Sequence, residues 1–280
     1  MRLARTLVAL AAVAMSPACA PQAPAARVLA ITPQIIRAQA TDARQVEIRV
    51  FAPVRPKGVL VFGHGASGSP DRYAALFARL NSAGYAVMAP VHVDSPQNPD
   101  HANYNLQTAF MERIADVRAT ARSAAERFPG IPVAAAGHSY GALFAQMQGG
   151  ALRYISDARA PEVRAVVSFS SPGIIPGLVQ PAAAFTTLTV PSLTVTGTAD
   201  VVPGFVSNWE DHLVAYRGAP AGGRYAFVLP GGEHGLIVGG ASEQFERTVA
   251  VTILFLDAYL LGDARARRHL DAPTSGLERR

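Results

Sequence analysis

The stretch Ala-Ala-Ala-Gly-His-Ser-Tyr-Gly-Ala at residues 134–142 decides the fold. The apolar residues 131–136 predict a short buried strand, and the small apolar residues 142–150 predict a packed helix. Gly137 and Gly141 stand two residues on either side of Ser139, so strand and helix can approach closely around a sharp turn. Such a turn lifts the serine hydroxyl clear of the backbone, next to the amide and positive dipole end of a helix N-terminus. The stretch predicts that Ser139 is a catalytic nucleophile; the alternative is a glycine-rich turn with an ordinary exposed serine.

Apolar runs of strand length alternate with longer helical patterns on both sides of this stretch. Strands are predicted at 28–37, 45–51, 58–62, 85–91, 163–169, 191–196 and 224–229, and helices at 71–82, 105–128, 205–216 and 242–261. This rhythm predicts an α/β fold with a mostly parallel central sheet and helices on both faces. The connection 170–189 is too short for a large helical cap. We expect one domain over 27–262, followed by a basic C-terminal tail at 263–280.

A serine nucleophile needs a base and a group that orients the base. In an open parallel sheet, ligands bind at the carboxyl ends of the strands. Asp200 ends a tight turn after the strand at 191–196, and His234 lies in a glycine-rich turn after the strand at 224–229. We therefore predict His234 as the base and Asp200 as its orienter. The alternatives are a hydrogen-bonded loop histidine and a turn aspartate that caps the next helix.

Three other ionisable residues, Glu210, Asp211 and His212, fall inside the predicted helix at 205–216, where no strand end presents them. We therefore expect them to lie outside the site.

The oxyanion formed during acyl transfer needs backbone amides near the nucleophile. Tyr140, the residue after Ser139, supplies one, and Ala66 in the loop after the strand at 58–62 is placed to supply the other. Residues expected to line the substrate pocket around them are His64, Gly65, Ser67, Asp94, His138 and Ser171.

The loop at 92–101 carries residue types that can bind metal ions. His92, Asp94, Asp100 and His101 provide imidazole and carboxylate groups, but their spacing matches no established zinc or calcium loop. We expect a pocket wall there and no metal site, with a bound ion as the alternative.

Four motifs together resemble those of the α/β-hydrolases: Gly63-His64-Gly65-Ala66, Gly137-His138-Ser139-Tyr140-Gly141, Gly197-Thr198-Ala199-Asp200 and Gly232-Glu233-His234-Gly235. Within that superfamily the chain resembles the serine esterases of the chlorophyllase, dienelactone-hydrolase-like and polyester-hydrolase (cutinase-like) groups. The resemblance implies an α/β-hydrolase fold and hydrolysis of small or polymeric carboxylic esters through an acyl-enzyme, without a cofactor. Two departures stand out: dienelactone hydrolases use a cysteine nucleophile, and secreted polyester hydrolases usually carry disulfides.

Two further functions fit the same motifs. The triad would also serve an amidase or peptidase, since its chemistry is the same for both leaving groups. A catalytically silent α/β-hydrolase that only binds a ligand is the other alternative, although the intact nucleophile, acid and base argue against it.

The N-terminus predicts export. Arg2 and Arg5 precede an apolar run at 7–15 and a small, proline-containing stretch, which is typical of a secretory signal peptide at 1–20 cleaved between 18 and 26. We expect a secreted or periplasmic protein without a stable membrane anchor. Cys19, the single cysteine of the chain, leaves a lipoprotein as a minor alternative and excludes an intramolecular disulfide.

The net charge of the 280-residue chain is +5, and much of the basicity lies at the C-terminus. We interpret this as a solvated tail, because a nucleic-acid-binding face would need clustered basic and aromatic residues. No nucleic-acid partner is expected. The basic residues concerned are Arg265, Arg267, Arg268, Arg279 and Arg280.

Overall fold

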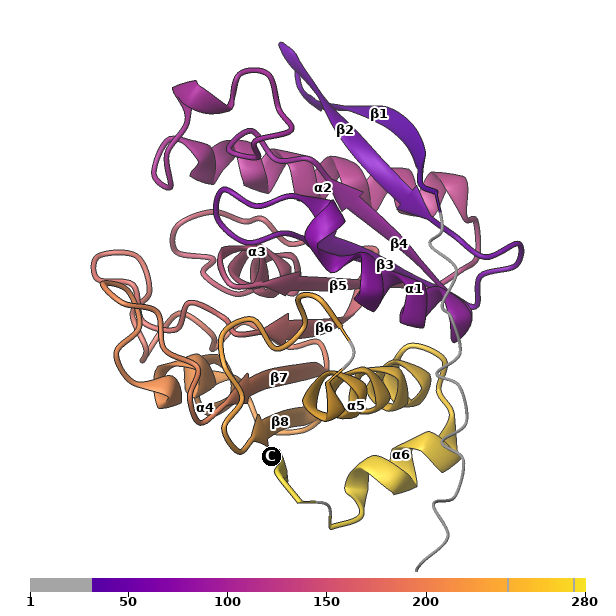
Figure 1. Ribbon diagram of the computed structural model, residues 1–280, viewed down its shortest axis with the longest axis vertical. Coiled ribbons are helices and arrows are strands. Elements are labelled where there is room, and N and C mark those ends of the chain that lie inside the picture. Colours follow the sequence, from indigo (N-terminus) through magenta and orange to yellow (C-terminus); the bar gives the residue numbers. More distant parts are fainter. Residues whose placement is uncertain (1–31, 241, 274) are drawn as a thin grey trace, which may run out of the picture.

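The computed structural model describes residues 32–240, 242–273 and 275–280. The predicted signal peptide, its cleavage region and Cys19 lie outside the described residues. Nine strands form one sheet in the order β1-β2-β4-β3-β5-β6-β7-β8-β9 (Figure 1). Their bounds are β1 Gln34–Thr41, β2 Arg44–Phe51, β3 Gly58–Gly63, β4 Tyr85–Pro90, β5 Val133–His138, β6 Val163–Phe169, β7 Ser192–Gly197, β8 Arg224–Leu229 and β9 Leu277–Arg279.

The centre of the sheet is parallel, as predicted. Strands β4, β3, β5, β6, β7 and β8 pair in parallel with one another in this order. The β1–β2 hairpin joins the edge at β4 in antiparallel register, and β9 closes the opposite edge against β8. Every residue of β3, β5 and β7 is buried. This explains the continuous apolar run of β3, whereas β7 also buries the polar side chains of Ser192, Thr194 and Thr196.

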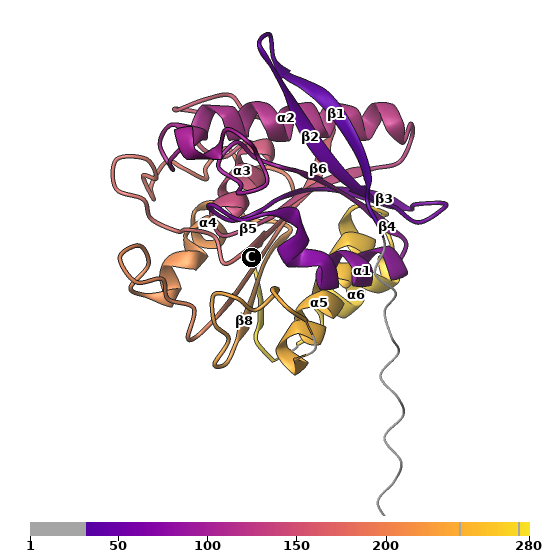
Figure 2. The same ribbon diagram turned by 45° about the horizontal axis from the view of Figure 1, so that its top comes forward.

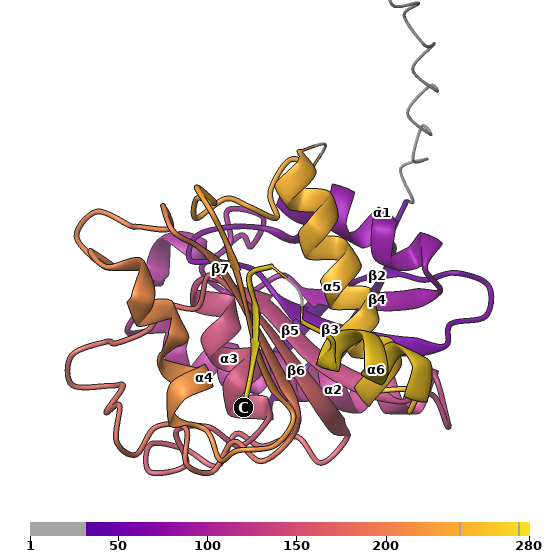
Figure 3. The same cartoon turned by 90° about the horizontal axis from the view of Figure 1, so that it is seen from below.

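Helices cover both faces of the sheet. The α-helices are α1 Ala74–Ser82, α2 Ala109–Arg127, α3 Tyr140–Gln148, α4 Val214–Gly218, α5 Glu243–Tyr259 and α6 Ala264–Asp271, and 3-10 turns lie at Pro70–Tyr73, His101–Asn103 and Trp209–Leu213. Helices α1 and α5 pack together on one face with α6 beside α5 (Figure 3). Helices α2 and α3 pack on the other face, where α2 also covers the β1–β2 hairpin (Figure 2). Each face has its own hydrophobic core, so the sheet is held from both sides.

The connection between β6 and β7 contains turns and no helix among its described residues, in agreement with the expected lack of a large cap. Of the described helices, none is both long and apolar enough to span a membrane.

Three parts of the chain differ from the sequence prediction. Among the described residues, the first strand, predicted at 28–37, lies at Gln34–Thr41. Residues 264–280 are not a solvated tail: α6 buries Ala266 and Leu270, and β9 adds a strand to the sheet. Only two apolar side chains anchor α6, so its amphipathic pattern is too sparse to stand out in the sequence. The helix predicted at 205–216 begins later, as a 3-10 turn capped by Asn208 and followed by the short α4.

Candidate active site

Ser139 lies between β5 and α3 in a strained backbone conformation, with φ 53° and ψ −125°. The residues two positions before and two positions after Ser139 must be glycines. A Cβ at Gly137 would lie 2.3 Å from the carbonyl oxygen of Gly141, and a Cβ at Gly141 would lie 2.1 Å from that of Gly63. The backbone amide of Ser139 donates to Phe169 O at 2.9 Å, which ties the turn to β6. The half-buried serine therefore stands on the sharp strand-to-helix turn that the sequence predicts.

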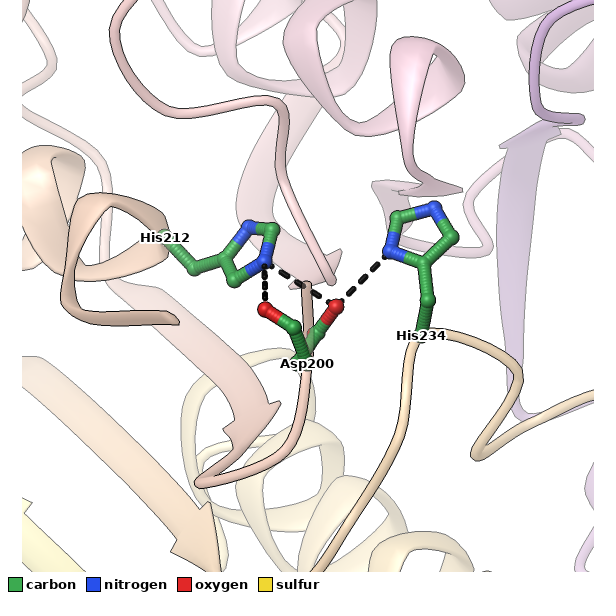
Figure 4. A group of neighbouring side chains, drawn as sticks. All are labelled: Asp200, His212 and His234. Atoms are coloured by element: carbon green, nitrogen blue, oxygen red, sulfur yellow. Dashed lines mark hydrogen bonds and ion pairs between the residues drawn. The ribbon is translucent and has the colours of Figure 1, made fainter. Parts of the chain in front are cut away.

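Asp200 and His234 meet at the ends of the neighbouring strands β7 and β8. His234 Nδ1 lies 2.8 Å from Asp200 Oδ1 (Figure 4). Thr196 Oγ1 donates to Asp200 Oδ2 at 2.8 Å. Asp200 is fully buried and His234 is half-buried. Burial alone would raise the pKa of the Asp200 carboxyl, but hydrogen bonds from His212 and His234 outweigh it and lower that pKa. The carboxylate is thus held ionised against the ring of His234.

His212 is a site residue that the sequence interpretation excluded. Its ring lies on the other side of Asp200 from His234, and its Nε2 is 3.0 Å from Asp200 Oδ1 (Figure 4). The 3-10 turn Trp209–Leu213 packs on β7, which brings the side chain of His212 back to the strand end. No sequence signal could have placed it there, because the position depends on where the turn begins and not on helical spacing.

The segments that carry the two predicted oxyanion amides lie next to Ser139. A Cβ added to Gly65 would lie 3.5 Å from Ser139 Cβ, so the loop after β3 lies directly against the nucleophile. Tyr140 is the first residue of α3, where backbone N–H groups have no intrahelical partner. Among the described residues, none accepts a hydrogen bond from the amides of Ala66 or Tyr140. The predicted role of these amides in binding an oxyanion requires such N–H groups without an acceptor.

A buried arginine on α2 anchors the loop at residues 64–67 by hydrogen bonds. Arg113, fully buried, contacts both oxygens of Asp94 at 2.7 Å and donates to the carbonyl oxygens of His64 at 2.8 Å and Gly65 at 3.0 Å. Asp94 Oδ2 in turn accepts from the amide of Ser67 at 2.9 Å. Although burial opposes ionisation of Asp94, the hydrogen bond and charge of Arg113 lower the pKa of the Asp94 carboxyl. The network holds residues 64–67 in place.

Tyr73 and His138 connect the same loop to the turn that carries His234. The Tyr73 hydroxyl accepts from the Gly65 amide at 3.1 Å and lies 3.0 Å from His138 Nδ1. His138 Nε2 lies 2.7 Å from the carbonyl oxygen of His234 and must be the donor there, so Nδ1 is the acceptor of the Tyr73 proton. Burial lowers the pKa of His138 to about 4, which keeps the ring neutral in this chain of hydrogen bonds.

The expected pocket lining is corrected at four positions. His64, Asp94, His138 and Ser171 are at most 6% exposed, so they present little surface to a substrate and instead support the site from within. Their polar groups are used inside the protein: the hydroxyl of Ser171, for example, bonds to Gln146 Oε1 at 3.3 Å. Of the predicted pocket residues, Gly65 is buried against Ser139 and Ser67 is exposed beside the exposed Ala66.

The four candidate metal ligands of the 92–101 loop do not converge. His92 contacts Asp116 at 2.9 Å, and Asp94 contacts Arg113, whereas Asp100 and His101 are exposed. Among the described residues, the one group of three side chains close enough to share an ion is Asp200, His212 and His234, whose facing atoms already bond to one another.

The strand order, the strained serine turn and the Ser–Asp–His chain order define an α/β-hydrolase. More closely, the chain belongs to the serine aminopeptidase S33 family, whose sequence profile matches residues 54–236. That segment runs from just before β3 through the His234 turn. The protein is therefore a hydrolase of the α/β-hydrolase type.

Solved structures with the same fold include esterases. The esterase Est2 of Thermogutta terrifontis is 18% identical, with a TM-score of 0.61, and the match covers 81% of this chain and 92% of that one. TT1662 from Thermus thermophilus is 22% identical, with a TM-score of 0.56 and coverage of 81% and 98%. The esterase domain of a Rhodothermus marinus protein is 16% identical, with a TM-score of 0.58 and coverage of 81% and 98%. A search of curated proteins gives no significant sequence match.

Proposed function

We propose that the protein hydrolyses carboxylic esters through an acyl-serine intermediate, with Ser139 as nucleophile, His234 as base and Asp200 as its orienter. The observation that carries the proposal is the Asp200–His234 hydrogen bond of 2.8 Å at the sheet edge where the strained Ser139 turn lies. This bond leaves Nε2 of His234 as the nitrogen able to take a proton.

The reaction follows from these groups. Ser139 Oγ attacks the ester carbonyl carbon and passes its proton to His234 Nε2, and the carbonyl oxygen becomes an oxyanion bound by the amides of Ala66 and Tyr140. The tetrahedral intermediate breaks its C–O bond to the alcohol, which leaves with the proton from His234. A water molecule then attacks the acyl-serine by the same route and releases the carboxylic acid.

Peptide or amide hydrolysis is the second candidate, because the family is described as a serine aminopeptidase. An aminopeptidase needs a carboxylate to receive the α-amino group of its substrate. Asp94 and Asp200, two carboxylates held at the described site, are engaged by Arg113 and by histidines. Ester cleavage is our first choice, and small-molecule or polymeric esters are the proposed substrates.

The test combines a covalent label with a triad variant. A fluorophosphonate should attach to the peptide that contains Ser139; support comes from the related T. terrifontis esterase 2, which has been solved phosphorylated by paraoxon. Asp200→Asn should keep the fold but lose roughly 10⁴-fold in kcat, since His234 would then adopt the wrong tautomer. Labelling of another serine, or an active Ser139→Ala variant, would refute the proposal.

The leaving group is tested separately. A p-nitrophenyl ester should be cleaved faster than a p-nitroanilide of the same acyl group. A faster anilide, especially one with a free α-amino group, would establish the aminopeptidase activity instead.

Export of the enzyme is also proposed, on the signal-like sequence at 1–20. Expression of the full chain in a bacterium should give a shortened protein outside the cytoplasm, with an N-terminus between 18 and 26 by mass spectrometry. A full-length cytoplasmic product would contradict it, and a lipid-modified Cys19 would establish the lipoprotein alternative.

A further inference from the structure

His212 has a hydrogen-bonding environment that fixes its charge. Its Nδ1 faces the carbonyl oxygen of Ser171, and its Nε2 faces both Asp200 Oδ1 and the Asp200 carbonyl oxygen, each at 3.0 Å. All of these groups are acceptors, and the side chain is fully buried. A neutral imidazole has one N–H and would leave one nitrogen lone pair against an oxygen. Both nitrogens must therefore carry a proton, which makes the ring an imidazolium cation.

The direction in which the pKa of His212 is shifted agrees with a protonated ring. Burial disfavours a cationic ring, but the hydrogen bond and negative charge of Asp200, together with the carbonyl acceptors, outweigh it and raise the pKa of His212. Asp200 is fully buried too, and a buried carboxylate needs a compensating charge.

Building on the proposed ester hydrolysis, we propose that His212 is a doubly protonated positioning residue whose charge holds the Asp200 carboxylate in place against His234. Asp200 Oδ1 bonds to both histidines, so the cation fixes the oxygen that orients His234. The two imidazole rings lie 6.0 Å apart. The cation therefore stabilises the ionised carboxylate that lies between the two rings.

The other ionisable groups near these rings do not replace this charge. His138 packs on His234 with ring centroids 4.9 Å apart but is kept neutral by burial, which lowers its pKa to about 4. On the 3-10 turn itself, Glu210 pairs with Arg217 at the surface, and Asp211 is half-buried. Asp200 and His212 thus form the charge pair next to the base.

The charge is tested by NMR of the wild-type protein with ¹⁵N-labelled histidine. The chain has seven histidines, and one should keep protons on both ring nitrogens at pH 9, where free histidine is neutral. This signal should vanish in His212→Gln and persist in His269→Gln, an exposed control on α6. If wild type shows no imidazolium at pH 9, or if the signal survives in His212→Gln, the proposal is overturned. The wild-type spectrum decides even if His212→Gln does not fold.

The functional part is tested by steady-state kinetics with p-nitrophenyl acetate at pH 8. His212→Gln keeps an N–H donor for Asp200 but removes the charge, so kcat should fall about 10-fold or more while KM stays near the wild-type value. His269→Gln should match wild type. A merely structural histidine would lower the number of active sites that a fluorophosphonate labels and leave kcat per labelled site unchanged, and that result would refute the role. If the fluorophosphonate fails to label Ser139, the ester hydrolase proposal fails, whereas the NMR result on His212 still stands.

Discussion

Replacing Tyr73 by phenylalanine tests the buried hydrogen-bond chain that joins the oxyanion loop to the base. The change removes one oxygen and keeps the ring, which packs against Phe62 with centroids 4.8 Å apart. It leaves the Gly65 amide without its acceptor and His138 Nδ1 without its donor. Tyr73 is 1% exposed, so water cannot take the place of the hydroxyl.

The expected loss of stability follows from those two groups. A buried polar group left without a partner costs about 1–3 kcal/mol, so two cost about 2–6 kcal/mol. No cavity forms, and the hydroxyl no longer has to be desolvated, which favours the lower part of that range. We expect Tyr73→Phe to lower the free energy of unfolding by about 2–4 kcal/mol.

Tyr154→Phe is the matched control. Its hydroxyl also makes two hydrogen bonds, donating to Leu178 O at 2.8 Å and accepting from the Gln180 amide at 3.0 Å, but the residue is 45% exposed. Water can replace these bonds, so the loss should stay below about 0.5 kcal/mol. Urea unfolding at pH 8 measures both variants, with the midpoint falling at constant m for Tyr73→Phe. Equal losses for the two variants would refute the argument from burial.

Four further predictions extend to pH, packing, substrate and metals. Burial lowers the folded-state pKa of His138 to about 4, below the unfolded value of 6.5. The stability gained by keeping this ring neutral is therefore complete above pH 6.5 and is lost as the pH falls toward 4. Urea titrations should show about 3 kcal/mol less stability at pH 4 from this group alone. Gly141→Ala should lower the free energy of unfolding by about 3 kcal/mol or more, because its Cβ would meet Gly63 O at 2.1 Å. Gly235→Ala has open space around it and should unfold near the wild-type midpoint, and calorimetry measures both variants. Rates with p-nitrophenyl esters should peak at or below about six acyl carbons, since the β6–β7 connection builds no lid; a rise continuing to twelve carbons would indicate a deep pocket. Exhaustive chelation should leave activity and the thermal midpoint unchanged, and a midpoint restored by added zinc or calcium would reveal a bound ion.

The helices and strands were largely predictable because they depend on local periodicity. The predicted strands at 163–169 and 224–229 coincide with β6 and β8. The prediction failed where few apolar residues carry the pattern. Residues 264–280 are rich in arginine, and their structure depends on contacts such as the hydrogen bond from Tyr225 to Asp271 at 2.7 Å. Such a contact joins residues 46 positions apart and leaves no periodic signal.

The residues of the candidate active site show the same difference between local and long-range information. Ser139, Asp200 and His234 each follow a parallel strand, and such strands end at one edge of the sheet, so the sequence could predict that these residues approach one another. It could not predict which of the neighbouring polar residues would be buried. His64 and Asp94 were expected in the pocket wall, but they face Arg113 beneath the loop.

By itself, then, the sequence determined the order of strands and helices, the sharp serine turn and the edge of the sheet where chemistry takes place. Each of these follows from apolar spacing or from a glycine at a fixed offset, both of which act within a few residues. Only the tertiary structure decided that Tyr73, Arg113 and His212 support the site. Each comes from a helix or a 3-10 turn, and its partner depends on how that element packs against strands distant in sequence. A side chain's direction on its own element is local information, but the group that it meets there is a property of the whole fold.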